Sequence, residues 1–202
     1  KEETGAQGAD RARASAGLNM IVHVVLVSDQ VLQNLIPLLM ERPDQAFLVI
    51  SPEMARRRAD QRLVRQLRGL PLEIIRCAEA PDAGFPQIQA FANTLVEQVM
   101  EQCPGAEIVL NATGGTKLMS IGFVEVFRGI ASRILYTDTA HRCIEYLPSE
   151  AARCAPPAPT PMAQVLDVPA YLRAQGFQFQ CAVSDDDIWH DHATARKAAC
   201  KF

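Results

Sequence analysis

Short runs of Val, Ile and Leu alternate along the chain with longer segments whose apolar residues recur at helical spacing. The short runs predict six strands, at residues 21–27, 46–50, 72–76, 107–111, 132–137 and 142–147. Runs that are apolar on both faces are typical of a parallel sheet covered by helices. The sixth run follows the fifth so closely that the two must pair antiparallel, because a parallel crossover needs a dozen or more residues. We therefore expect the sixth strand to close one edge of the sheet.

Four segments between these strands have the apolar periodicity of helices, at residues 30–40, 53–68, 88–103 and 117–129. Pro37 lies inside the first helix and should bend or shorten it. The second helix carries six arginines, which we interpret as a solvated face or a partner contact because the chain as a whole is acidic. The fourth helix is apolar on nearly every side, which indicates a place in the core or at a subunit interface.

This order of strands and helices predicts the α/β class, with a Rossmann-like, mostly parallel sheet flanked by helices at residues 20–147. An antiparallel edge strand and a short C-terminal extension complete the expected fold. Residues 1–19 lack the apolar segment of a signal peptide, so we interpret them as a tag remnant or a flexible lead-in. Residues 148–163 are rich in Pro and Ala and predict a linker. Residues 164–202 are then the start of a C-terminal module or a connector.

Composition and charge narrow the possible functions. The 202 residues are 49% hydrophobic and 21% charged, which is typical of a folded globular chain. A net charge of −3 argues against a protein that coats long nucleic acids. The apolar run at residues 20–27 is too short to cross a membrane, and six scattered cysteines without a C-x-x-C pair indicate reduced thiols. We expect a cytoplasmic protein without a cofactor, and His190 and His192 are spaced too poorly on a helix to predict a metal site.

The segment with the clearest chemistry joins the fourth strand to the fourth helix. In open parallel sheets, ligands bind beyond the carboxyl ends of the strands, where helices point their positive N-termini. Here two glycines let backbone N–H groups approach an anion, two threonines add hydroxyls and a lysine adds an ammonium group. The spacing fits neither a Walker loop nor a dinucleotide fingerprint, and an ordinary glycine turn stays open as the alternative. The candidate ligand-binding residues of this loop are Asn111, Thr113, Gly114, Gly115, Thr116 and Lys117.

A second polar cluster follows the first predicted strand. In a Rossmann-type sheet the first and fourth strands are neighbours, so the residues after them should open one shared crevice. Further candidate ligand-binding residues are Ser28, Asp29, Gln30 and Asn34, with Ser51 after the second strand. Ser and Asp at such positions also cap helices, an alternative that we favour for Asp29 and Ser51 and leave open for Ser28.

Two segments, Val27-Ser-Asp-Gln-Val-Leu-Gln-Asn-Leu-Ile-Pro37 and Asn111-Ala-Thr-Gly-Gly-Thr-Lys-Leu-Met-Ser120, resemble the CRISPR-associated Rossmann-fold (CARF) sensor family. The resemblance is nearest to the branch in which the sensor precedes a PD-(D/E)xK nuclease. It implies a homodimer that binds a cyclic tetra-adenylate or cyclic hexa-adenylate ring across its two-fold axis. It also implies that the loop from Thr113 holds phosphates and ribose, while the residues after the first strand contact the ring.

The sequence departs from this family pattern in two places. Gln33 stands where the pattern has a proline before Asn34, and no D…[DE]-x-K effector motif is present. We therefore expect contact with nucleic acid only through a missing effector domain.

Three functions follow from the resemblance. The preferred one is a sensor of type III CRISPR antiviral signalling, in which a cyclic oligoadenylate, cyclic tetra-adenylate in the first place, allosterically controls an attached effector. The second is a metal-independent ring nuclease, in which the ribose 2′-hydroxyl attacks the phosphate while Lys117, with Thr116, stabilises the transition state. The third is a ligand-controlled transcription regulator, which the acidic excess after residue 164 argues against.

Overall fold

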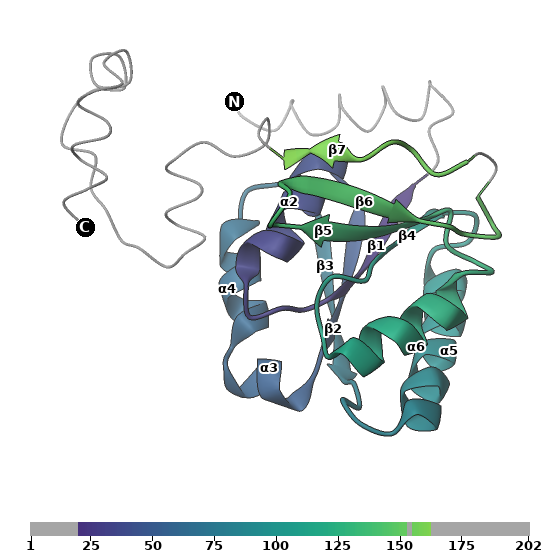
Figure 1. Ribbon diagram of the computed structural model, residues 1–202. Coiled ribbons are helices and arrows are strands. Elements are labelled where there is room, and N and C mark those ends of the chain that lie inside the picture. The colour runs from purple at the N-terminus through teal and green to yellow at the C-terminus, as the bar shows by residue number, and fades with distance from the viewer. Residues whose placement is uncertain (1–19, 153–154, 163–202) are drawn as a thin grey trace, which may run out of the picture.

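The computed structural model describes residues 20–152 and 155–162, in which a sheet lies between two layers of helices (Figure 1). The strands are β1 (Ile21–Leu26), β2 (Gln45–Ile50), β3 (Glu73–Glu79), β4 (Glu107–Asn111), β5 (Arg133–Asp138), β6 (Cys143–Leu147) and β7 (Thr160–Pro161). The helices are α2 (Val31–Glu41), α3 (Pro52–Arg56), α4 (Ala59–Gln66), α5 (Phe85–Gln102) and α6 (Lys117–Phe127). The predicted α/β, Rossmann-like fold is confirmed. The expected lead-in and C-terminal module lie outside the described residues.

The strand order is β3-β2-β1-β4-β5-β6-β7. Strand β1 pairs in parallel with β2 on one side and with β4 on the other, so the chain crosses between the two halves of the sheet beside β1. Val25 lies opposite Asn111 of β4, and Leu26 lies opposite Val49 of β2. The carboxyl ends of β1 and β4 are therefore neighbours, as the sequence predicts, and this is the point at which open α/β sheets bind ligands.

The sheet separates two hydrophobic cores, because alternate residues of each strand point to opposite faces. In β1, Val22, Val24 and Leu26 join the core under α5 and α6, whereas Val25 joins the core under α2 and α4. Each fully buried large side chain contributes roughly 1.5 to 3 kcal/mol. The largest in the first core are Phe47, Phe123 and Phe127, and the second contains Leu35, Leu38 and Leu63. The two cores thus hold helices against both faces of the sheet.

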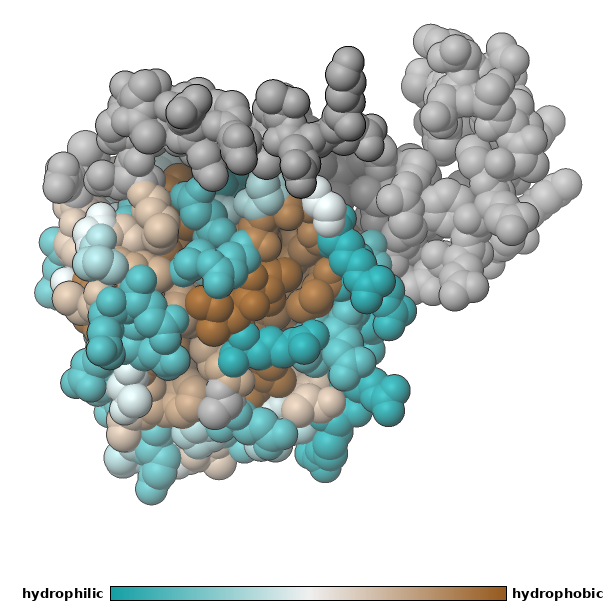
Figure 2. All heavy atoms as spheres, turned by 180° about the vertical axis from the view of Figure 1, so that it is seen from behind, coloured by the Kyte–Doolittle hydropathy of each residue, from teal (hydrophilic) through white to brown (hydrophobic). Residues whose placement is uncertain are grey.

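The two edges of the sheet differ. The predicted antiparallel pairing of β6 with β5 is confirmed, but β6 is not the outermost strand, because Thr160 and Pro161 of β7, within the stretch predicted as a linker, pair antiparallel with β6. At the other edge, β3 has no further strand beside it among the described residues, and its Ile74 and Ile75 are only half-buried. Seen from behind, apolar side chains gather in a patch between hydrophilic ones (Figure 2).

The segment predicted as one helix at residues 53–68 forms two helices. Arg58 adopts a left-handed conformation, with φ of 53°, between α3 and α4. Residues other than Gly, Asn and Asp rarely adopt this backbone conformation, so the presence of an arginine here does not predict a break between two helices. No helix in the described part of the chain is both long and apolar enough to span a membrane.

Candidate ligand-binding site

The loop between β4 and α6 lies directly on the end of β1. The Gly115 N–H donates a hydrogen bond to the Val27 carbonyl oxygen at 3.3 Å. A Cβ atom on Gly114 would lie 1.9 Å from the Leu26 carbonyl oxygen, so only glycine lets the two backbones approach this closely. The structure therefore brings the predicted anion loop and the residues after β1 to one place.

The loop turns into α6 through a second glycine. Gly115 has a φ of 73°, a left-handed value that favours glycine, and the next residue, Thr116, caps α6 by accepting a hydrogen bond from the Met119 N–H at 3.2 Å. Gly115, Thr116 and Lys117 are all exposed. Lys117 makes no ion pair with any other described residue, so its ammonium group and the helix N-terminus are both accessible to an anion.

Asn111 shapes this loop from inside. It is fully buried, and its Oδ1 atom accepts hydrogen bonds from the Thr113 N–H at 3.1 Å and the Thr113 hydroxyl at 2.6 Å. The Thr113 Oγ1 atom in turn accepts a hydrogen bond from the Thr137 N–H of β5 at 2.8 Å. Asn111 was a candidate ligand contact, but its burial leaves it no surface for a ligand, and its role is to hold Thr113.

The loop between β1 and α2 is held by a buried side chain of the same kind. Asn34 accepts a hydrogen bond from the Ser28 N–H at 2.7 Å and donates one to the Leu26 carbonyl at 2.9 Å. Asn34 is fully buried, so it too positions the site rather than lining it. Ser28 is half-buried and Gln30 is exposed, and the Ser28 hydroxyl accepts a hydrogen bond from the Gln30 N–H at 3.2 Å. Ser28 therefore forms a local turn and is not the cap of α2, which is Gln30.

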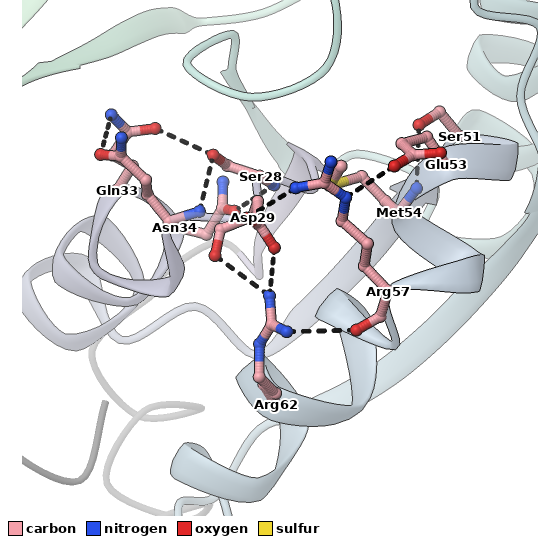
Figure 3. A network of polar contacts seen from close by, with 10 residues as sticks. Ser28, Asp29, Gln33, Asn34, Ser51, Glu53, Met54, Arg57 and Arg62 are labelled. Carbon is pink, nitrogen blue, oxygen red and sulfur yellow. Dashed lines mark hydrogen bonds and ion pairs between the residues drawn. The ribbon is translucent and has the colours of Figure 1, made fainter. Parts of the chain in front are cut away.

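Ser51 and Asp29 have different structural roles. Ser51 is buried and caps α3 by accepting a hydrogen bond from the Met54 N–H at 3.4 Å, so the capping alternative is confirmed for it. For Asp29 that alternative is wrong. Its carboxylate binds the guanidinium groups of Arg57, at 3.1 Å, and Arg62 (Figure 3). The hydrogen bond from Arg62, before that from Arg57, lowers the pKa of Asp29.

The sequence analysis missed this pair of arginines. In one continuous helix, residues five apart point about 140° away from each other, so Arg57 and Arg62 would face different directions. The break at Arg58 turns both toward Asp29, and Arg62 also donates a hydrogen bond to the Asp29 carbonyl oxygen at 3.2 Å. The arginines thereby fix the turn that carries Ser28 and Gln30.

A histidine and an aspartate lie at the carboxyl end of β5, beside β4. The Nδ1 atom of His141 is 2.7 Å from the Asp138 carboxylate, whose other oxygen accepts the backbone N–H groups of Ala140 and His141. The hydrogen bond to Asp138 raises the pKa of His141. The sequence alone indicates a packed or exposed His141, although an Asp three residues before a His is the spacing that could have indicated this pair.

The other features of the described residues do not add to this site. No group of three or more His, Cys, Asp or Glu residues within 20–152 and 155–162 could hold a metal ion. A cavity of about 470 Å³ lies at the opposite, amino-terminal end of β4 and β5, where Glu107, Arg133 and Pro156 line it. The predicted crevice lies at the other end of these strands, where the carboxyl ends of β1 and β4 are neighbours.

The chain matches a protein-family model and a number of solved structures. The family model described as the Card1 CARF domain matches residues 22–171. Among solved structures, Can2 from Sulfobacillus thermosulfidooxidans in complex with cyclic tetra-adenylate is 28% identical, with a TM-score of 0.60 over 77% of this chain and 41% of Can2. No curated protein matches the chain.

Two further structures share the fold. Protein VC1899 from Vibrio cholerae is 20% identical, with a TM-score of 0.56 over 78% of this chain and 40% of its own. A type III CRISPR defence DNA nuclease activated by cyclic oligoadenylate is 21% identical, with a TM-score of 0.51 over 63% of this chain and 20% of its own. The chain thus spans about two fifths of the length of Can2 and of VC1899.

Proposed function

The chain belongs to the CARF domain family represented by Card1, and from this premise we propose that it is a sensor domain for a cyclic oligoadenylate. One observation carries the proposal: the exposed segment from Gly115 to Lys117 lies against the end of β1. N–H groups at a helix N-terminus, together with an ammonium group that no described residue pairs with, favour phosphate. A ring of phosphodiesters offers such an anion at every nucleotide.

The ligand-facing residues are those of the candidate set that reach the surface. Gly115, Thr116 and Lys117 take phosphate oxygens, and Ser28 and Gln30 contact the ring from the β1 side. The buried candidates position the loops and do not contact the ligand themselves. The residues that shape the two loops are Asn34, Asn111, Thr113 and Gly114, with Asp29 as the partner of the arginines, whereas Ser51 caps α3.

The preferred ligand is cyclic tetra-adenylate, held by a homodimer. Can2, at 28% identity, binds this ring in its solved structure, and a two-fold symmetric ring fits a two-fold axis. Beside Lys117, the side chains of Leu118 and Ile121 are 38% and 53% exposed, although most large apolar side chains of α6 are buried. A second subunit would cover them. Replacing Ile121 with Asp should convert a dimer to a monomer in sedimentation experiments.

Binding of the ring would control an effector in type III CRISPR antiviral signalling in the cytoplasm. Differential affinity for two dimer arrangements is the physical requirement for such control. The chain spans two fifths of Can2. We place the effector in a domain attached to this sensor, and the resemblance favours a PD-(D/E)xK nuclease.

Calorimetric titration with cyclic tri-, tetra- and hexa-adenylate tests the proposal. We expect one cyclic tetra-adenylate per dimer. Lys117→Ala should weaken binding by about 1.5 to 3 kcal/mol, the usual value of a hydrogen bond to a charged group. The matched control is Arg128→Ala, which removes one exposed positive charge at the opposite end of α6 and should bind like the unchanged protein. Equal affinity of the two variants would contradict the proposed site.

The pair of His141 and Asp138 favours a second candidate function, metal-independent cleavage of the bound ring. In this reaction the ribose 2′-oxygen bonds to phosphorus, and the bond from phosphorus to the 5′-oxygen breaks. The His141 imidazolium gives its proton to that leaving oxygen, and the 2′-hydroxyl proton passes to water. Incubation with cyclic tetra-adenylate and a chelator should yield linear products that His141→Gln abolishes. An intact ring that remains bound excludes this second function and leaves the sensor.

A further inference from the structure

Pro37 leaves one carbonyl group of α2 without its helical partner. In an α-helix the carbonyl of residue 33 accepts a hydrogen bond from the N–H of residue 37, and proline has no N–H. The Gln33 carbonyl is therefore free in the first half of α2, on the side of the helix that meets β4 and β5. A buried carbonyl without a donor costs free energy, so another donor has to satisfy it.

Two side chains from the sheet supply the donors. The Thr137 hydroxyl of β5 donates to the Gln33 carbonyl oxygen at 2.9 Å, and the Asn111 amide of β4 donates to it at 3.4 Å. Both side chains are essentially fully buried. Asn111 and Thr137 are also the two residues that hold Thr113, so the Gln33 carbonyl anchors the anion loop.

The side chain of Gln33 holds the opposite half of the site. Its Oε1 atom accepts a hydrogen bond from the Ser28 hydroxyl at 3.0 Å, and its Nε2 atom donates one to the Gln30 side chain at 3.0 Å. Figure 3 shows Gln33 turned toward Ser28 across the start of α2. One residue thus contacts both loops of the crevice, through its backbone on one side and its side chain on the other.

We propose that Gln33, with its carbonyl freed by Pro37, is a positioning residue that sets the spacing between the two loops of the ligand site. This inference rests on the proposed function. A proline at position 33, as the family pattern has it, could make none of the side-chain bonds. The arrangement predicts that ligand affinity depends on Pro37 and Thr137, which are both buried.

Pro37→Ala is the first test, with cyclic tetra-adenylate as the probe in calorimetry. The alanine introduced at position 37 has an N–H that can bond to the Gln33 carbonyl, which then releases Thr137 and Asn111. Since a bond of this kind has a net value of about 0.5 to 1.5 kcal/mol, the loss of one should lower affinity about 2- to 12-fold, and the loss of both should lower it further. The thermal midpoint should stay close to that of the unchanged protein, because the helix regains a hydrogen bond. The control, Pro86→Ala, lies in the first turn of α5, where no helical bond is missing, and should leave affinity unchanged.

Thr137→Val is the second test and does not depend on how well the Pro37→Ala variant folds. Valine keeps the shape of threonine and removes the hydroxyl, whereas Thr137→Ser keeps the hydroxyl. We expect a similar loss of affinity for valine and a restored affinity for serine. Unchanged affinity in either Thr137→Val or Pro37→Ala overturns the inference and leaves the sensor proposal intact. A protein that binds none of the rings before any substitution overturns both.

Discussion

The two loops that meet at the end of β1 are shaped by different means. Each loop is held by a buried asparagine, Asn111 or Asn34, but the loop before α6 depends mainly on its backbone, because Gly114 packs on the Leu26 carbonyl and Gly115 has a left-handed φ. The loop before α2 is shaped by side chains, since Asn34 holds it from inside and Asp29 binds Arg57, which follows α3, and Arg62 of α4 on the outside. A backbone-shaped loop leaves its N–H groups open to an anion, and a side-chain-shaped loop offers hydroxyl and amide groups.

This difference predicts how much free energy a substitution in each loop costs. A backbone that approaches another backbone has no room to adjust, so a single added carbon is costly. A side chain that forms two hydrogen bonds costs about the value of those bonds when it is removed. An exposed ion pair costs least, because water and salt screen it.

The largest effect is expected for Gly114→Ala. The added Cβ would overlap the Leu26 carbonyl oxygen, so the anion loop must leave β1, at a cost of roughly 3 kcal/mol or more. Urea denaturation measures the loss of stability, and calorimetry with cyclic tetra-adenylate should show no binding. Gly129→Ala is the matched control, since nothing lies within 4 Å of a Cβ there. Equal stability of both variants would show that the loop can move without cost.

A smaller effect is expected for Asn34→Ala. The substitution leaves the Ser28 N–H and the Leu26 carbonyl without a partner in a buried place, which costs about 2 to 3 kcal/mol in the free energy of unfolding. The control is Asn93→Ala on the exposed face of α5, where the amide bonds only to the Gln89 carbonyl of the same helix. If the two variants unfold at the same urea concentration, the β1 loop does not depend on its buried amide.

Much of the backbone-shaped loop could be predicted from sequence. Paired glycines between an apolar strand and a helix indicate a tight turn of the backbone, and the period of apolar residues placed β1, β4 and α6 within two residues of their observed ends. The neighbouring positions of β1 and β4 followed from the expected Rossmann-type order. Residue type, periodicity and handedness of crossovers are local or general properties, so one sequence is enough to use them.

The side-chain-shaped loop could not be predicted in the same detail. Ser28, Gln30 and Asn34 are all polar, and only the packing of α2 on the sheet decides that Asn34 is buried while Gln30 is exposed. The partners of Asp29 depend on the left-handed backbone conformation of Arg58, which the residue type does not predict. The role of Gln33 depends on Thr137, which is 104 positions away in sequence. Such contacts are properties of the folded chain.

The smallest effect is expected for Asp29→Asn, and its size depends on pH. Because Arg62 and Arg57 lower the pKa of Asp29 in the folded state, the carboxylate stabilises the fold above its unfolded pKa of about 3.9. That stability is lost as pH falls through the lower folded pKa. The Asp29 side chain is 44% exposed, so solvent screening limits the contribution to about 1 kcal/mol or less. The unchanged protein should therefore exceed Asp29→Asn in stability at pH 7 and approach it near pH 2, as measured by urea denaturation.

Repeating the series in 1 M NaCl should shrink the difference in stability at pH 7. A difference that persists at both low pH and high salt would mean that Asp29 shapes the loop through neutral hydrogen bonds, and the exposed side of the loop would then resemble its buried side.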